Sequence, residues 1–404
     1  MKYKFETKTI GDCCDITKKT IHPEKGQVYT CFSLPAFDNS NTPEILNGEE
    51  IKSSKFVLDE NTILFNKLNP KFRRVWNIHS LEKYENTICS TEFLPLKAKA
   101  NIEQDYLYYY VSSPYFTRLM DGIRTGTSNS QQRIDWKQFL REPINVPSLP
   151  VQRKVVSLLR NIDKKIELNN AINNNLEQQA KAIFKSWFVD FEPFGGVQPS
   201  EMQFIPLQEL CKVVTKGTTP TTLGKSFTSS GINFIKAESI LDNHSIDSSK
   251  FAFIDEETNA LLKRSIIKAN DIVFTIAGTL GRFAMVDNSV LPANTNQAVA
   301  IIRPDETKVT PAYLYSFFIG NWHNEYYSKR IQQAVQANLS LTTIKSLPIA
   351  VLNNTTMSNY DKLVSPLFAL MKNNEEENRK LSKLRDALLP KLMSGELDVS
   401  GIDL

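Results

Sequence analysis

The 404-residue sequence has few cysteines and histidines and no long apolar run. Its five cysteines are odd in number and form no C-x-x-C pair, which argues against a disulfide framework and against a zinc site. Its four histidines are scattered along the chain. The first residues lack the apolar core of a secretory signal, and no apolar stretch could span a bilayer. We therefore expect a soluble, cytoplasmic protein that binds no metal and contacts no membrane.

Motifs of nucleotide, cofactor and catalytic sites are also missing. Gly224-Lys225-Ser226 lacks the glycine that a phosphate-binding loop needs five positions before its Gly-Lys. Asn69-Pro70-Lys71-Phe72 lacks the second proline of the Asn-Pro-Pro-aromatic loop of amino-methyltransferases. Residues 276–282 have neither the glycine spacing nor the following long helix of a dinucleotide site. The sequence predicts a protein that is not an enzyme and has no cofactor of its own.

Charge of one sign is only slightly in excess, because 48 Lys and Arg residues face 44 Asp and Glu residues. A net charge of +4 is compatible with nucleic-acid binding but does not argue for it. Any DNA-binding surface must therefore come from local groups of cations.

The sequence does contain an internal repeat. At a shift of 205 residues, the apolar pattern of 134–143 matches that of 339–348, and the match continues through Asn169 and Asn374. It weakens toward the N-terminal part of each half. We predict an α+β fold with two related globular domains that end alike but differ inside.

Each half ends in a segment whose apolar residues recur every seven positions, which is typical of a coiled-coil helix. Each helix would be about 57 Å long at 1.5 Å per residue and would need a partner along its length. We therefore predict that the two helices pack on each other, with central asparagines meeting near one level. The alternative is an Asn-rich solvated turn that breaks shorter helices. The predicted helix-pair and partner-interface residues are Ile162, Ile166, Asn169, Asn173, Leu176, Ile183, Phe184, Trp187, Phe188, Leu367, Leu370, Asn374, Leu381, Leu384, Leu388 and Leu392.

The predicted organisation alternates globules and helices. Short β-type runs punctuated by turns fill both globules, and prolines and glycines mark a hinge between the first helix and the second globule. The predicted segments are a first globule 1–148, a helix 149–191, a hinge 192–200, a second globule 201–352, a helix 353–396 and a tail 397–404.

Polar loops supply the candidate DNA contacts, because cations bind phosphate and forked polar side chains bind base edges. In the first globule these are Lys67, Lys71, Arg73, Arg74, Arg124, Thr127, Ser128 and Gln131. In the second they are Thr218, Thr219, Thr275, Thr279, Arg282, Asn294, Asn296, Gln297, Gln333, Gln336 and Asn338. The alternative is that these are ordinary solvated loops.

Several stretches carry a resemblance to a known family. They are FKSWFVDFEPF at 184–194, the run at 163–169 before it, LRDALLPKLMSGELDVS at 384–400, ANTNQAVAII at 293–302, and residues 207–217 and 53–76. Along nearly its whole length the chain resembles the specificity subunit of a type I restriction–modification system.

The resemblance implies two target-recognition domains held apart by an antiparallel helix pair, each binding one half of an asymmetric target on double-stranded DNA. It also implies two modification subunits, which hold S-adenosylmethionine and methylate adenine. Restriction subunits would add translocation and cleavage that use ATP and Mg²⁺. No base contact can be transferred residue by residue, because the recognition domains of this family vary.

Two other classes of protein remain as alternatives. A coiled-coil scaffold whose globules bind proteins would explain the repeat but not the match at Trp187–Phe194. A nuclease, or a fused methyltransferase and nuclease, would need a further domain for which the assigned segments leave no room. Retention of the protein on DNA at moderate salt would separate the recognition subunit from the scaffold.

Overall fold

The computed structural model describes residues 4–123, 132–331, 339–399 and 401. It divides into two compact units, the first comprising Met1–Leu168 with Glu377–Leu404 and the second Asn169–Glu376. Two 40-residue helices each begin in one unit and end in the other: α6 (Leu149–Phe188) and α11 (Asn354–Met393). Among the described residues, no helix has both the length and the apolar character needed to cross a membrane.

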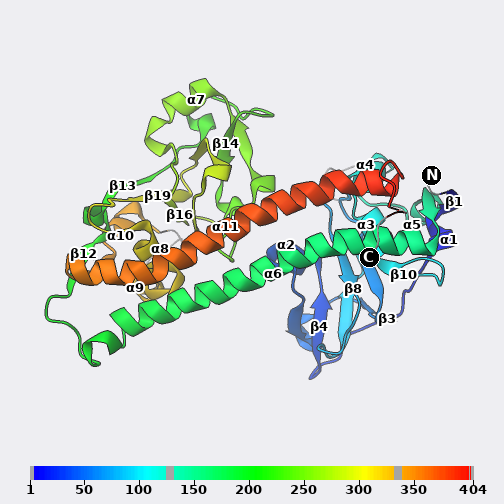
Figure 1. Cartoon of the computed structure of the whole chain (residues 1–404), viewed down its shortest axis with the longest axis horizontal. Helices are drawn as coiled ribbons and strands as arrows, with labels where there is room; N and C mark the ends of the chain where they lie inside the picture. Colours follow the sequence, from blue (N-terminus) through cyan, green and yellow to red (C-terminus); the bar gives the residue numbers. More distant parts are fainter. Residues whose placement is uncertain (1–3, 124–131, 332–338, 400, 402–404) are drawn as a thin grey trace. The chain divides into compact units, whose positions relative to one another are not determined.

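The first unit contains a four-stranded antiparallel sheet, a five-stranded sheet and a separate two-stranded pair (Figure 1). Their strand orders are β2-β10-β7-β8, β3-β6-β9-β4-β5 and β1-β11. The strands are β1 (Phe5–Thr9), β2 (Cys14–Ile16), β3 (Thr20–Ile21), β4 (Val28–Phe32), β5 (Glu44–Asn47), β6 (Lys55–Val57), β7 (Thr62–Asn66), β8 (Val75–Ile78), β9 (Thr87–Ser90), β10 (Phe93–Ala98) and β11 (Pro143–Pro147). The short helices are α1 (Ile10–Cys13), α2 (Leu34–Ser40), α3 (Gln104–Val111), α4 (Pro114–Gly122) and α5 (Trp136–Arg141).

The second unit contains a four-stranded antiparallel sheet, a three-stranded sheet and a two-stranded pair. Their orders are β13-β19-β16-β17, β15-β14-β18 and β12-β20. The strands are β12 (Gln203–Pro206), β13 (Cys211–Lys216), β14 (Ile232–Ile235), β15 (Ala252–Ile254), β16 (Ile272–Thr275), β17 (Phe283–Met285), β18 (Ala293–Thr295), β19 (Val299–Pro304) and β20 (Pro348–Val351). The short helices are α7 (Glu256–Leu261), α8 (Pro311–Ile319), α9 (Trp322–Ile331) and α10 (Leu341–Lys345).

The two units repeat one topology. The order β2-β10-β7-β8 matches β13-β19-β16-β17. The order β5-β4-β9 matches β15-β14-β18, including the parallel pairing of β4 with β9 and of β14 with β18. In the first unit β6 and β3 extend this second sheet. The prediction of two related α+β domains that end alike and differ inside is confirmed.

Local sequence determines where several helices begin. Ser113 accepts a hydrogen bond from the Phe116 amide at the start of α4, and Thr310 accepts one from the Tyr313 amide at the start of α8. A proline follows each capping residue, at a position where the missing N–H costs nothing. These caps fix the helices that cover the four-stranded sheets.

In each unit, half of α6 packs against half of α11 in antiparallel fashion. In the first unit, Asp163 accepts a hydrogen bond of 2.8 Å from Arg385, and Lys165 lies 3.1 Å from Glu377. In the second, Asn374 donates to Asn173 at 2.8 Å, and Asn173 donates to the Met371 carbonyl at 3.1 Å. The predicted meeting of central asparagines is therefore confirmed, and α6 is not broken into shorter helices.

The seven predicted helix-pair and partner-interface residues of α11 differ in burial, and two of them are exposed. Leu370 and Leu384, predicted as helix-pair or partner-interface residues, are 44% and 48% exposed, so they lie outside the buried contact of the helix pair. Val364 and Met371 are buried instead, and α11 continues through Pro366 although a proline has no N–H for a helical hydrogen bond. Rows that begin three or four residues after Tyr360 both satisfy a seven-residue period, so the period alone does not select the buried row. The 205-residue shift indicates the right row, because it carries Leu159, Ile166, Asn173, Ala180 and Trp187 onto Val364, Met371, Asn378, Arg385 and Leu392.

The aromatic end of α6 belongs to the core of the second unit. Phe184 and Phe188 are buried, and their rings lie 6.0 and 5.2 Å from that of Tyr313. Trp187 contacts the ring of Tyr360 at 5.6 Å. The predicted helix-pair contact of Phe184 and Phe188 is confirmed, because their rings lie 6.3 and 5.1 Å from that of Tyr360 on α11. The predicted partner-docking role of both residues is corrected, because the chain's own core covers their side chains.

Candidate DNA-reading loops

Two equivalent hairpin loops contain many of the predicted contact residues. The first loop, residues 67–74, joins β7 to β8, and the second loop, residues 276–282, joins β16 to β17. The Asn66 amide donates to the Arg74 carbonyl at 3.1 Å, and the Thr275 amide donates to the Arg282 carbonyl at 2.8 Å. These matching bonds close the loops in the same way, so Arg74 and Arg282 are equivalent residues.

A buried polar side chain forms hydrogen bonds to the backbone of each loop. Asn66 donates from Nδ2 to the Leu68 carbonyl at 2.6 Å and accepts from the Leu68 amide at 2.9 Å. The Thr275 hydroxyl donates to the Thr279 carbonyl and accepts from the Arg282 amide at 2.9 Å. Since Thr275 is fully buried, it shapes the second loop and cannot itself contact a base. Thr279 is exposed on the same loop.

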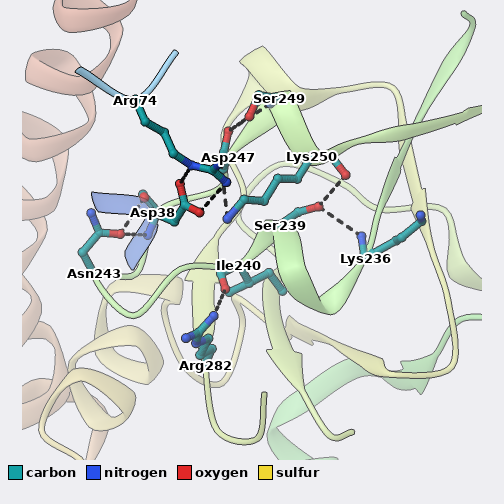
Figure 2. Close-up of polar contacts among 11 residues, drawn as sticks. Asp38, Arg74, Lys236, Ser239, Ile240, Asn243, Asp247, Ser249, Lys250 and Arg282 are labelled. Carbon is teal, nitrogen blue, oxygen red and sulfur yellow. Dashed lines mark hydrogen bonds and ion pairs between the residues drawn. The ribbon is translucent and has the colours of Figure 1, made fainter. Parts of the chain in front are cut away.

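Each loop arginine forms a two-point pair with an aspartate. Arg74 donates from Nε and Nη2 to the two carboxylate oxygens of Asp38, and Arg282 donates in the same way to Asp242; all four distances are 2.6 Å. The aspartates occupy matching places, since Asp38 follows β4 and Asp242 follows β14. Figure 2 shows the Arg74–Asp38 pair and the contact of Arg282 with the Ile240 carbonyl.

In these pairs the aspartates are more exposed than the arginines. The side chains of Arg74 and Arg282 are 17% and 22% exposed, and those of Asp38 and Asp242 are 45% and 53% exposed. A carboxylate that holds the Nε–Nη2 edge leaves donors on Nη1 and Nη2. The aspartate can therefore orient the guanidinium of the arginine, while some N–H donors of the guanidinium stay available.

The other cations of the first loop differ in their surroundings. Arg73 lies 3.5 Å from Asp386 on α11. Lys71 is exposed, and its ammonium lies 5.1 Å from the centre of the Phe72 ring. Arg74 lies over the same ring at 4.7 Å. Arg73 and Arg74 are therefore paired with carboxylates of the chain, whereas Lys71 is exposed.

In the second unit, two predicted loops meet. The Gly217 amide donates to the Asn296 carbonyl at 3.1 Å, and the Thr219 hydroxyl donates to Gln297. A Cβ at position 217 would lie 1.9 Å from the Thr295 carbonyl oxygen, so only glycine permits this approach. Gln297 is exposed at the junction, and Thr218 lies beside Thr219. The two loops therefore form one polar surface.

Sequence reasoning missed Arg264 at this surface. Its Nη2 lies 3.5 Å from the Lys216 carbonyl and 3.4 Å from the Thr218 hydroxyl. Arg264 belongs to the 3-10 turn Lys263–Ser265, far in sequence from both loops, and no local motif indicated it.

Asn294, a predicted DNA contact, lies inside the fold and supports it. It is fully buried, accepts from the Ser265 hydroxyl at 2.7 Å and donates to Asn259 at 2.8 Å. Asn296 accepts from the Ala298 amide at 3.1 Å and so shapes its turn. Seven other candidates lie outside the described residues: Arg124, Thr127, Ser128, Gln131, Gln333, Gln336 and Asn338.

The loop containing Asp242 also contacts α6 within the second unit. The His244 ring stacks on Phe283 with ring centres 4.1 Å apart, and its Nε2 lies 3.9 Å from Glu177 on α6. Burial lowers the pKa of His244, so the neutral ring is favoured. The fold and the loops together define a protein with two related units whose loops differ in surface chemistry.

Comparison with known proteins agrees with this description. The type I restriction modification DNA specificity domain matches residues 2–178 and 199–354. The chain is 24% identical to the type I restriction enzyme HindI specificity subunit of Haemophilus influenzae, with 91% of this chain and 96% of that protein covered. It is 26% identical to the MjaIX specificity subunit of Methanocaldococcus jannaschii, with 74% and 71% covered.

The fold is similar to that of the type I restriction–modification S subunit from M. genitalium, with a TM-score of 0.52, 16% identity and 96% of each chain covered. Because the family match includes most of the chain, the protein belongs to the type I restriction modification DNA specificity domain family. It is a specificity subunit, the non-catalytic component that directs DNA recognition in such a system.

Proposed function

We propose that each unit recognises one half of a split, asymmetric target on double-stranded DNA. The repeated pairs Arg74–Asp38 and Arg282–Asp242 carry this proposal, because they occupy equivalent places in units whose other loop residues differ. The donors that remain on such a guanidinium can bind O6 and N7 of guanine. Two domains that recognise different half-sites need a base-contacting residue at the same place in the fold, with different residues around it.

We propose residues 1–148 and 201–352 as the recognition domains, 149–191 and 353–396 as the conserved helices, 192–200 as the hinge and 397–404 as the tail. In the first domain, Lys67, Lys71, Arg73 and Arg74 are proposed contacts. In the second, the exposed Gln297, with Thr218, Thr219, Thr279, Arg264, Arg282 and Asn296, forms the proposed reading surface. Thr275 and Asn294 hold its loops.

We propose that two modification subunits dock on the long helices and methylate adenine with their S-adenosylmethionine. Restriction subunits would join them and use ATP and Mg²⁺. Exposed leucines on α11 support a docking role: Leu363 and Leu370 in the second unit, and Leu384 in the first, are 46%, 44% and 48% exposed. Leu363 and Leu370 are seven residues apart and so lie on one face of α11, and contiguous exposed apolar patches are typical of interaction surfaces.

We propose that the lengths of α6 and α11 set the number of undefined bases between the half-sites. Deleting Asn169–Asn175 together with Lys372–Asn378 removes one heptad from each helix, about 10 Å. These segments face each other, since Asn173 contacts Asn374. The deletion should change the spacer by a few base pairs and leave both half-sites unchanged.

Mapping of methylated adenines tests the proposed function. The subunit would be expressed with its modification partner in a host that has no other such system. We expect one motif, made of two short defined half-sites separated by undefined bases. A continuous motif, or methylation without sequence preference, would overturn the proposal.

A further inference from the structure

Trp136 occupies an apolar position of the internal repeat, yet its side chain is 40% exposed. It is the first residue of α5, and its counterpart at a shift of 205 is the partly buried Leu341. The Lys18 ammonium lies 4.0 Å from the centre of the indole, and the Lys137 ammonium lies 5.9 Å from it. An exposed tryptophan with two lysines over its ring requires an explanation beyond core packing.

Lys67 belongs to the same part of the first unit. Its carbonyl accepts a hydrogen bond of 3.0 Å from the Ile134 amide, and Leu68 and Arg133 form a β-bridge beside it. Burial and then the positive charge of Lys67 lower the pKa of Lys18, which indicates that the two ammonium groups affect each other. Three segments far apart in sequence thus bring three lysines to one surface.

These lysines differ from the arginines near them. Within 4–123, 132–331 and 339–399, no carboxylate forms an ion pair with Lys18, Lys67 or Lys137. The Asp135 carboxylate accepts from the backbone amide of Lys137. By contrast, the chain's own carboxylates pair with nearby arginines, as Arg133 with Glu92, Arg74 with Asp38 and Arg73 with Asp386.

We propose that Lys18, Lys67 and Lys137 bind the phosphate backbone of DNA, and that Trp136 is a positioning residue for Lys18. Unpaired ammonium groups held close together repel one another, and an approaching polyanion removes that repulsion. Lysine binds phosphate as a point charge, and the tryptophan face holds a cation in place without neutralising it. The first loop begins at Lys67, so phosphate contacts here would position the same loop that reads bases.

This inference rests on the proposed function, and a salt titration tests it separately. The complex of the full chain with its modification subunits would be titrated with duplex DNA that contains the methylated motif, and with an unrelated duplex. For Lys18→Gln and Lys137→Gln, we expect the slope of log affinity against log salt to become shallower by about 0.9 per lysine. Affinity for both duplexes should fall in parallel, while the methylated motif stays unchanged.

Two further variants sharpen the test. Trp136→Ala should reproduce the effect of Lys18→Gln, whereas Trp136→Phe should restore most of the binding. Lys83→Gln is the matched control, because Lys83 also lies over an aromatic ring, that of Tyr84, at 4.9 Å. We expect the salt slope of this control to equal that of the unchanged protein.

The outcomes distinguish the two proposals. If the unchanged complex binds its motif and both lysine variants keep its salt slope, the inference is wrong and the proposed function stands. If the variants lose assembly with the modification subunits in size-exclusion chromatography, the surface docks protein and the inference is also wrong. If the unchanged complex shows no preference for its motif, the proposed function fails instead.

Discussion

The two units share their four-stranded sheet and differ most in the second sheet. In the second unit this sheet has three strands, and in the first unit β6 and β3 extend the same three-stranded arrangement. The shared sheet supplies the hairpin loops and the buried side chains of Asn66 and Thr275 that hold them. The segment after a strand of the second sheet supplies the aspartate that pairs with the loop arginine. The difference teaches that the surroundings of a loop can change while the strands that support it stay the same.

The largest expected effect is a loss of folding stability in one unit when a side chain of its core is truncated. Phe184 and Leu389 are 205 residues apart, and both are buried, Phe184 in the second unit and Leu389 in the first. We expect Phe184→Ala to destabilise the second unit by about 3–5 kcal/mol and Leu389→Ala to destabilise the first by about 2–5 kcal/mol. Hydrogen exchange would locate each loss. Equal loss of protection in both units from either change would contradict the separation.

The two units should also differ in their response to acid. His323 is fully buried in the second unit, and burial, followed by the charge of His244, lowers its pKa to about 3. Its other close neighbours are aromatic rings, including those of Phe318 and Tyr327. The unfolded chain takes up this proton near the ordinary histidine pKa of about 6.5, so stability is complete above that pH and is lost as pH falls toward 3.

At pH 5 this loss should amount to about 2 kcal/mol in the second unit. His244, whose pKa burial also lowers, adds to it. His323→Phe should reduce the acid sensitivity of the second unit. Hydrogen exchange at pH 7 and pH 5 checks this, and an earlier loss of protection in the first unit would contradict it.

The smallest of these effects concerns the loop arginines. Arg74→Lys and Arg282→Lys keep the charge but lose the planar fork that pairs with an aspartate or with a guanine. We expect each change to weaken binding by about tenfold, within the usual range for a paired base contact. Discrimination against substituted bases should weaken in one half-site for Arg74 and in the other for Arg282. Binding to a panel of singly substituted duplexes measures this, and loss at both half-sites from one change would exclude separate readers.

The sequence predicts the repeat, the two helices and the central asparagines because each leaves a regular pattern. The seven-residue period alone allows two contact rows on α11, so it does not distinguish the exposed Leu370 from the buried Met371, which only packing selects. Arg74 and Arg282 are identified as loop cations, but their aspartates lie 36 and 40 residues away, and no motif links them. The repeat marks Trp136 only as an apolar position, and such a position does not reveal whether the rest of the chain covers the side chain, which is 40% exposed.

Exchange of one recognition domain tests the central claim most directly. Residues 201–352 would be replaced by the corresponding domain of another specificity subunit, and methylated adenines would be mapped in a host that expresses the hybrid with the modification partner. If the two units read separate half-sites, one half-site will change to that of the donor subunit, and the other will stay as it was. A change in both half-sites, or in neither, would contradict the account.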